Sequence, residues 1–328
     1  MKNHPAFRRA LLRWFRENGR DLPWRLTRDP YAVLVSEMML QQTQVAAMLP
    51  YYNDWLGRFP NFAVLARATE REVLHAWEGL GYYNRARNLH ATAQIIQNQY
   101  CGIFPREIAK IGNLPGIGRY TANAVASFAF DRSAPIVEAN SARVLARLFN
   151  LQTPIDSSNG RAQLWRNAAN LVPKRNAGHF NSALLDLGAL VCLPRNPCCG
   201  ICPVKVFCRA KDPESLPIKR ARPATKRLTE DYLLFVRQNQ ILLEQSHSRW
   251  RKMWILPPRK LDDSKRSSAG APIYSSVFPF THHLITLRVF RDRARKTANS
   301  SLRWFSISSL DSIPIPSPHR RAINALLN

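Results

Sequence analysis

The stretch Leu114–Phe130, LPGIGRYTANAVASFAF, is the part of the sequence that decides the fold. Pro115, Gly116 and Gly118 predict a tight turn, and the small residues after them predict a helix. The two glycines let the backbone approach an anion closely, and the new helix offers free N–H groups and a positive dipole end. The stretch is therefore typical of a helix–hairpin–helix (about residues 107–130) that holds a DNA phosphate, with a plain glycine-rich turn as the alternative.

The balance of charge supports a polyanionic partner. The chain has 328 residues and carries 48 Lys and Arg against 22 Asp and Glu, a net charge of +26. Such an excess is typical of proteins that bind nucleic acid and, less often, an anionic membrane. No apolar run is long enough to span a bilayer, so we expect no membrane association. We expect a monomer in the cytoplasm (the nucleoid) of a bacterium, or in the nucleus or an organelle of a eukaryote.

The organisation along the chain predicts two domains. Residues 1–211 show helical periodicity, including a helix that begins at Asp29 and Pro30. Residues 212–228 are rich in proline and basic residues and are interpreted as a linker. Residues 229–328 contain β-like runs (DYLLFV, QILLEQ, MWILP, THHLITLRVF and LRWFSI) and a last short helix. The predicted fold class is mostly α with a C-terminal α+β domain.

One acidic residue stands in an apolar stretch, Glu37 of SEMMLQQT (Ser36–Thr43). On a helix it shares a face with Val33, Leu34 and Leu40. If that face is buried, loss of solvent raises the pKa of the carboxyl and keeps a proton available near neutral pH. Glu37 is therefore a candidate general acid, and a buried glutamate with a structural hydrogen bond is the alternative.

Four cysteines follow the pattern Cys192-x6-Cys199-x2-Cys202-x5-Cys208. Four thiolates at these spacings suit tetrahedral zinc or a [4Fe–4S] cluster, and the spacing alone does not choose between them. Cys198 is adjacent and could compete as a ligand, but it breaks the pattern.

These motifs together resemble the endonuclease III superfamily of DNA glycosylases. VSEMMLQQTQV, GLGYYNRARNL and the long C-terminal extension resemble its MutY-type adenine glycosylases. The resemblance implies a [4Fe–4S] cluster at the four cysteines (loop 192–208) and a Nudix-like 8-oxoguanine-recognition domain over 229–328. It also implies removal of adenine from duplex DNA containing 8-oxoguanine·A or G·A mispairs.

The resemblance assigns catalytic roles to four residues. Glu37 would protonate the adenine ring, and Glu138, in a position where the family has aspartate, would stabilise the sugar cation. Asn140 would help to hold the site. Tyr120 occupies the slot in which bifunctional relatives carry a lysine nucleophile, which implies a monofunctional enzyme without an efficient lyase step. For Glu138, a carboxylate that complements the dipole of the following helix is the alternative.

The resemblance also assigns DNA and base contacts. Gln41 and Gln42 resemble the wedge that fills the gap left by an extruded base, with Gln42 the better candidate. Tyr82 resembles an aromatic that probes beside 8-oxoguanine, and Ser182 replaces a glutamine that contacts the adenine edge. The remaining predicted contacts are the phosphate-binding glycines and a hairpin motif in which threonine replaces serine: Gly116, Gly118, Phe280, Thr281 and His282.

Two other functions stay open on this sequence. One is removal of thymine or uracil from G·T or G·U mismatches on the same scaffold. The other is a catalytically weakened protein that binds 8-oxoguanine·A mispairs without cutting. The changes at Glu138 and Ser182 are the only support for the second.

Overall fold

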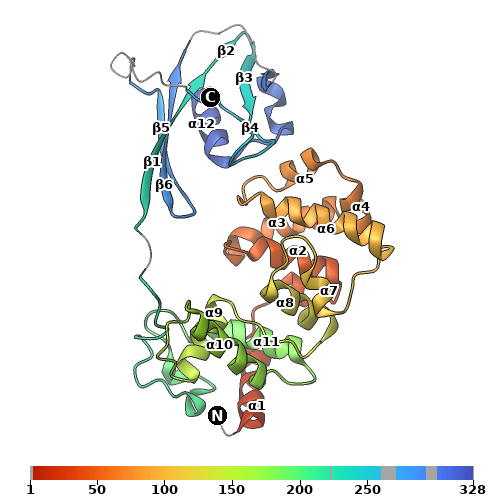
Figure 1. The fold of residues 1–328 in the computed structure, drawn as a ribbon, viewed down its shortest axis with the longest axis vertical. Helices are drawn as coiled ribbons and strands as arrows, with labels where there is room; N and C mark the ends of the chain where they lie inside the picture. Colours follow the sequence, from red (N-terminus) through yellow and green to blue (C-terminus); the bar gives the residue numbers. More distant parts are fainter. Residues whose placement is uncertain (1–2, 222–223, 260–270, 293–300, 328) are drawn as a thin grey trace. The chain divides into compact units, whose positions relative to one another are not determined.

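A computed structural model describes residues 3–221, 224–259, 271–292 and 301–327. The chain forms two compact units, one from residues 1–66 and 91–221 and the other from residues 67–90 and 222–328 (Figure 1). The α-helices are α1 (His4–Asn18), α2 (Pro30–Leu40), α3 (Val45–Arg58), α4 (Phe62–Arg67), α5 (Glu70–Ala76), α6 (Asn84–Tyr100), α7 (Ile108–Gly112), α8 (Arg119–Phe130), α9 (Ala139–Leu148), α10 (Ser158–Leu171), α11 (Ala177–Asp186) and α12 (Ser317–Leu327). The strands are β1 (Lys226–Leu234), β2 (Val236–Arg237), β3 (Gln240–Gln245), β4 (Trp254–Ile255), β5 (Tyr274–Phe280), β6 (His283–Arg291) and β7 (Leu302–Ser306).

The first unit is helical, as the sequence predicts. α2 begins where expected, because the Asp29 carboxylate accepts the N–H groups of Tyr31 and Ala32 and Pro30 occupies the first helical position. Every residue of α2 from Tyr31 to Met39 is buried, so this helix forms the centre of the unit rather than its surface. The burial of α2 also holds Glu37, near the C-terminal end of the helix, inside the unit.

Residues predicted as one long helix near position 190 form two pieces instead. α11 ends at Asp186 and continues as a wider π-type turn, η2 (Leu187–Val191). A Cβ atom at Gly188 would lie 2.8 Å from Cβ of Asn140, so the close approach of η2 to α9 requires glycine there. The wider turn leaves the Gly188 carbonyl free to accept a hydrogen bond from outside its own helix.

The β-strands of the second unit form two sheets, which confirms the predicted α+β class. β6 lies between β1, to which it is parallel, and β5, to which it is antiparallel (Figure 1). In the other sheet β3 pairs with β2, β4 and β7. Because β5 and β6 are joined by Thr281 and His282 alone, they form a hairpin with a two-residue turn.

The sequence analysis missed β5 and misplaced two strand ends. YSSVFPF of β5 contains two serines and a proline, which lower its β-propensity, and pairing with β6 overrides that preference. Thr281 and His282 were predicted to begin a strand but form the turn. β1 begins at Lys226, inside the stretch interpreted as linker, because β6 supplies a partner from His283 onward.

Among the described residues, no helix is long and apolar enough to cross a membrane.

Candidate active site

The carboxyl group of Glu37 is removed from solvent, with only 3% of the residue exposed. The Tyr120 hydroxyl of α8 donates a hydrogen bond to it, whereas Oε2 has no partner among the described residues. Burial raises the pKa of Glu37 to about 7; the Tyr120 bond opposes this rise, the charge of Glu138 adds to it and Arg25 opposes it. The carboxyl can therefore hold a proton at neutral pH and donate it to a base.

Glu37 lines a cavity of about 350 Å³ in the first unit. Three segments that are far apart in the sequence meet there: the loop after α1 supplies Arg25, α8 supplies Tyr120 and α11 supplies Ser182. Apolar side chains and several polar and charged ones line this cavity together, a combination that can hold a polar ring such as a nucleobase. The structure thus brings Glu37, Tyr120 and Ser182 to one cavity, although they come from three different helices.

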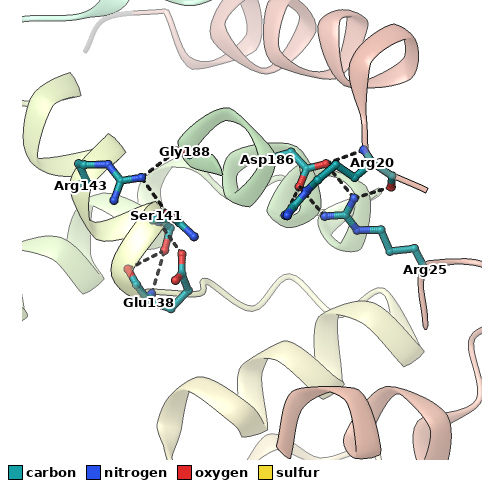
Figure 2. Close-up of polar contacts among 8 residues, drawn as sticks. Arg20, Arg25, Glu138, Ser141, Arg143, Asp186 and Gly188 are labelled. Atoms are coloured by element: carbon teal, nitrogen blue, oxygen red, sulfur yellow. Dashed lines mark hydrogen bonds and ion pairs between the residues drawn. The ribbon is translucent and has the colours of Figure 1, made fainter. Parts of the chain in front are cut away.

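Glu138 is not among the residues that line this cavity, but its charge acts on two that do. It contributes to raising the pKa of both Glu37 and Tyr120, which places the two carboxyl groups within electrostatic range. Glu138 is also the N-cap of α9: its Oε1 accepts the Ser141 N–H at 2.7 Å, and the Ser141 hydroxyl accepts the Glu138 N–H at 2.9 Å (Figure 2). Capping fixes the position of the Glu138 side chain, so capping and catalysis are compatible roles.

Arg143 fixes the position of Asn140 one turn into α9. Its Nη2 donates to the Gly188 carbonyl at 2.7 Å (Figure 2) and to Asn140 Oδ1 at 2.8 Å. Its Nε donates to the Cys192 carbonyl at 2.8 Å. This buried arginine therefore connects the start of α9 with η2 and with the first cysteine of the cysteine-rich loop. The Asn140 side chain is held by a charged donor rather than left free to rotate.

Two arginines at the cavity were not found by the sequence analysis. Arg20 and Arg25 both bind the fully buried Asp186, with Arg–carboxylate distances of 2.6 to 2.8 Å (Figure 2). Although burial alone would raise it, the hydrogen bonds from Arg25 and Arg20 hold the pKa of Asp186 below its ordinary value. Asp186 could have been noticed in the sequence because it is a single acidic residue in the apolar run ALLDLGAL. The same feature identified Glu37.

The two predicted wedge residues occupy the junction of α2 and α3. Gln41 caps α2 and its amide nitrogen lies 3.5 Å from Thr121 Oγ1, so its side chain faces the protein. Gln42 is exposed, with a φ of 60° that is unusual for a residue other than glycine. Of the two, Gln42 is therefore the one presented to solvent, in agreement with the preference from sequence.

The helix–hairpin–helix consists of α7, a turn and α8. Gly116 has a φ of 71°, a conformation that glycine adopts without strain. Gly118 is the N-cap of α8, and a Cβ atom built on it would meet nothing within 4 Å. Intramolecular packing does not require glycine there, whereas a phosphate that approaches the N-terminus of α8 would.

Comparison with known proteins identifies the family. The chain matches the HhH-GPD superfamily of base excision DNA repair proteins over residues 35–169. It is 30% identical to the adenine DNA glycosylase of Buchnera aphidicola subsp. Schizaphis graminum, over 97% of this chain and 98% of the relative. It is 38% identical to the adenine DNA glycosylase of Buchnera aphidicola subsp. Baizongia pistaciae, over 77% of this chain and 73% of the relative. This chain belongs to the adenine DNA glycosylase family.

Solved structures share the helical fold of this adenine DNA glycosylase family member. A thermostable thymine-DNA glycosylase is 32% identical, with a TM-score of 0.58, over 62% of this chain and 94% of that chain. A trapped endonuclease III–DNA covalent intermediate is 24% identical, with a TM-score of 0.54, over 64% of this chain and 97% of that chain. The second similarity shows the fold alone.

The cysteine-rich loop of this family member groups four thiols. Burial raises the pKa of Cys202 to about 11, and Cys192, Cys208 and Cys199 act on it in the same direction, so these four lie within electrostatic range of one another. Cys198 is not among the thiols that act on it. No three His, Cys, Asp or Glu side chains in the described ranges converge closely enough to hold a single metal ion. The side chains that act on Cys202 are all thiols, and a donor set made of sulfur alone is consistent with an iron–sulfur cluster.

The remaining predicted contacts lie in the second unit. Tyr82 is 43% exposed, and the Phe280–His282 motif forms the tip of the β5–β6 hairpin, which confirms the expected hairpin. Thr281 Oγ1 donates to the Phe280 carbonyl at 2.7 Å, and the Arg249 guanidinium lies 4.7 Å from the centre of the Phe280 ring. These contacts hold Thr281 and Phe280 in place at the hairpin tip, and Thr281 remains exposed there.

The raised pKa of Glu37 predicts a pH-dependent gain in stability for Glu37→Gln. A pKa raised from 4.5 to about 7 means that the folded state disfavours the ionised carboxyl by on the order of 3 kcal/mol. The stabilising preference for the protonated form is complete below pH 4.5 and is lost as the pH rises through about 7. Because glutamine stays neutral, denaturant unfolding should show the variant more stable than wild type at pH 8, with little difference at pH 5. An equal difference at both pH values would mean that Glu37 is ionised in the folded protein.

Proposed function

We propose that this protein is a monofunctional DNA glycosylase of base excision repair that hydrolyses the N-glycosidic bond of adenine mispaired with 8-oxoguanine or guanine in duplex DNA. The observation that carries the proposal is the Glu37 carboxyl, buried beside a base-sized cavity with a pKa of about 7 and with Glu138 in electrostatic range. Membership of the adenine DNA glycosylase family supports adenine as the base that is removed.

Glu37 supplies the proton that adenine needs to leave. Adenine is a poor leaving group as an anion, so donation of a proton to its ring accompanies cleavage of the bond to the sugar. The Tyr120 hydroxyl holds the Glu37 carboxyl by a hydrogen bond, and Ser182 lies in the same cavity to contact the base edge directly or through water. Burial of the carboxyl keeps the proton on Glu37 until a base enters the cavity.

Glu138 stabilises the sugar that adenine leaves behind. As the bond breaks the sugar develops oxocarbenium character, and a fixed anion lowers the energy of that transition state. The capping bonds from Ser141 hold the carboxylate in place, and Arg143 holds Asn140 beside it. Water then adds to the sugar carbon that adenine has left, and the proton that this water loses passes to the Glu37 carboxylate, which restores the acid.

Among the described residues that line the cavity, none is a lysine that could act as the nucleophile of a lyase step. Tyr120 occupies the slot of the bifunctional lysine, and burial raises its pKa well above the ordinary value, so it stays a neutral hydroxyl. Lys110 is exposed on α7 and is paired with Glu107 at 2.9 Å, and it does not line the cavity. The expected product is therefore an intact strand with an abasic site.

Recognition of the mispair uses residues that are exposed and shaped for DNA. Gly116 and Gly118 let a phosphate reach the N-terminus of α8, and Gln42 fills the gap that an extruded adenine leaves in the base stack. Tyr82 and the Phe280–His282 tip read the opposite base, because a threonine hydroxyl can donate to or accept from a purine edge.

Single-turnover excision on a panel of duplexes tests the proposal. We expect cleavage of A·8-oxoguanine and, more slowly, of A·G, with none of G·T, G·U or undamaged duplex, and with strand breaks only after alkaline treatment. Glu37→Gln should lower the rate to background and serves as the control for a contaminating glycosylase. Excision of thymine or uracil would favour the function of the related thymine-DNA glycosylase. Tight binding without excision would identify a mismatch-binding protein.

The role of Glu138 predicts different effects for two conservative changes. Glu138→Gln keeps an oxygen that can cap α9 but removes the charge, so the excision rate should fall by roughly 100-fold or more with the melting temperature nearly unchanged. Glu138→Asp keeps both the charge and a favoured N-cap residue and should retain measurable excision. Equal rates for wild type and Glu138→Gln under single-turnover conditions would limit Glu138 to its capping role.

We further propose that Cys192, Cys199, Cys202 and Cys208 hold a [4Fe–4S] cluster that orders the loop. The Arg147 guanidinium lies 3.3 Å from Cys192 Sγ and also donates to the Leu193 and Pro194 carbonyls, so the chain already fixes the first ligand. The purified protein should show a broad charge-transfer absorption near about 400 nm. Cys199→Ser should reduce this absorption and Cys198→Ser should not. A colourless protein that contains stoichiometric zinc would contradict the cluster.

A further inference from the structure

We propose that Arg85 and Arg320 are positioning residues for Tyr82, and that through it they set the discrimination between 8-oxoguanine and guanine opposite adenine. Neither arginine was predicted from the sequence to have a functional role. The inference rests on the proposed role of Tyr82 in reading the opposite base.

The loop that carries Tyr82 adopts backbone conformations that are unfavourable in isolation. Gly79 and Gly81 have φ values of 99° and 67°, and Tyr82 has a φ of 48°. A left-handed conformation is unfavourable for a residue with a Cβ atom, so it persists only where the surroundings enforce it. Something outside the loop must therefore hold the Tyr82 backbone in place.

Arg85 supplies that support from the first turn of α6. Its Nη2 donates to the Leu80 carbonyl at 2.9 Å and to the Gly81 carbonyl at 3.1 Å. Its guanidinium carbon lies 5.5 Å from the centre of the Tyr82 ring and 5.3 Å from the centre of the Trp77 ring. The same planar cation thus fixes both the backbone before Tyr82 and the orientation of its ring.

The Arg85 side chain is buried, whereas Tyr82 is exposed. Arg85 is only 5% exposed, and burial lowers its pKa to about 10, so it remains charged at neutral pH. Trp77 Nε1 also donates to the Gly81 carbonyl, at 3.1 Å. Tyr82 therefore has one ring face on a fixed cation and the remainder available to a base in the duplex.

Arg320 of α12 holds the other end of the loop within the same compact unit. Its guanidinium binds the Glu78 carboxylate through two bonds of 2.7 and 3.1 Å, and Glu78 directly precedes Gly79. The same guanidinium donates to the Leu310 and Ile313 carbonyls at 2.9 and 3.0 Å. Both side chains are largely buried, with 15% and 18% exposed, so this pair resists solvent screening better than a surface ion pair.

The two arginines therefore fix the Tyr82 loop from both sides without contacting DNA themselves. Loss of either should leave the excision chemistry at Glu37 in place and displace the probe. A displaced probe loses contacts that exist only with 8-oxoguanine, so excision from A·8-oxoguanine should slow more than excision from A·G.

The test compares single-turnover excision rates on A·8-oxoguanine and A·G duplexes, with the ratio of the two rates as the readout. We expect Arg85→Met and Arg320→Gln each to lower the ratio by roughly tenfold, the effect of losing about 1.4 kcal/mol of specific contact. The double variant Tyr82→Ala with Arg85→Met should have the same ratio as Tyr82→Ala alone, because the arginine acts through the tyrosine. Exchange of the charges, Glu78→Arg with Arg320→Glu, should recover part of the ratio.

Arg87→Gln is the matched control. It removes an arginine from the same helix, two residues from Arg85, together with its 2.9 Å ion pair to Glu70, but not a contact to the Tyr82 loop. Its ratio should match that of wild type. Should Arg85→Met fail to fold, Arg85→Lys retains the charge without the planar fork and should still lower the ratio.

The outcomes separate this inference from the proposed function. If Tyr82→Ala lowers the ratio and the folded Arg85 and Arg320 variants do not, the positioning role is overturned and the reader role of Tyr82 stands. If Tyr82→Ala itself leaves the ratio unchanged, the reader role fails and the positioning role fails with it. Additive losses in the double variant would show that Arg85 acts independently of Tyr82.

Discussion

The burial of one carboxyl group, that of Glu37, is the constraint on which the proposed chemistry depends. Glu37 sits in a helix whose residues from Tyr31 to Met39 are all buried, and its Oε2 has no hydrogen-bond partner within the described part of the chain. Any residue that neutralised this oxygen would return the pKa to its ordinary range and remove the proton donor. In the proposed mechanism, the apolar packing of α2 therefore contributes to catalysis as well as to stability.

Three acidic residues near one another show that burial alone does not decide protonation. Asp186 is fully buried but binds Arg20 and Arg25, and its pKa is lowered, whereas the buried Glu37 has a raised pKa. Glu138 differs from both because a helix N-terminus and Ser141 hold it. Their surroundings thus let one carboxyl carry a proton, set one to anchor arginines at the cavity and set one to cap α9.

Sequence reasoning reached the parts of this site that depend on local pattern. The sequence alone predicted the start of α2 at Asp29–Pro30 and the turn at Gly116. It also revealed an acidic residue in an apolar run. Long-range partners were not visible: nothing in the spacing of Arg20, Arg25 and Asp186 indicates that they meet, since the contact spans more than 160 residues. β5 was missed for the same reason, because its partner strand rather than its composition determines it.

The residues proposed to enter DNA share a backbone property that composition does not reveal. Gln42, Tyr82 and Thr281 have φ values of 60°, 48° and 54°, although none is glycine. Glycine would remove the strain at each position but also the side chain that has to reach a base. The strain is therefore tolerated for the sake of the side chain, and the surrounding structure must hold it: the α2–α3 junction at Gln42, Arg85 at Tyr82, and the two-residue turn at Thr281. Positioning residues such as Arg85 are thus as necessary to recognition as the side chains that make the contact.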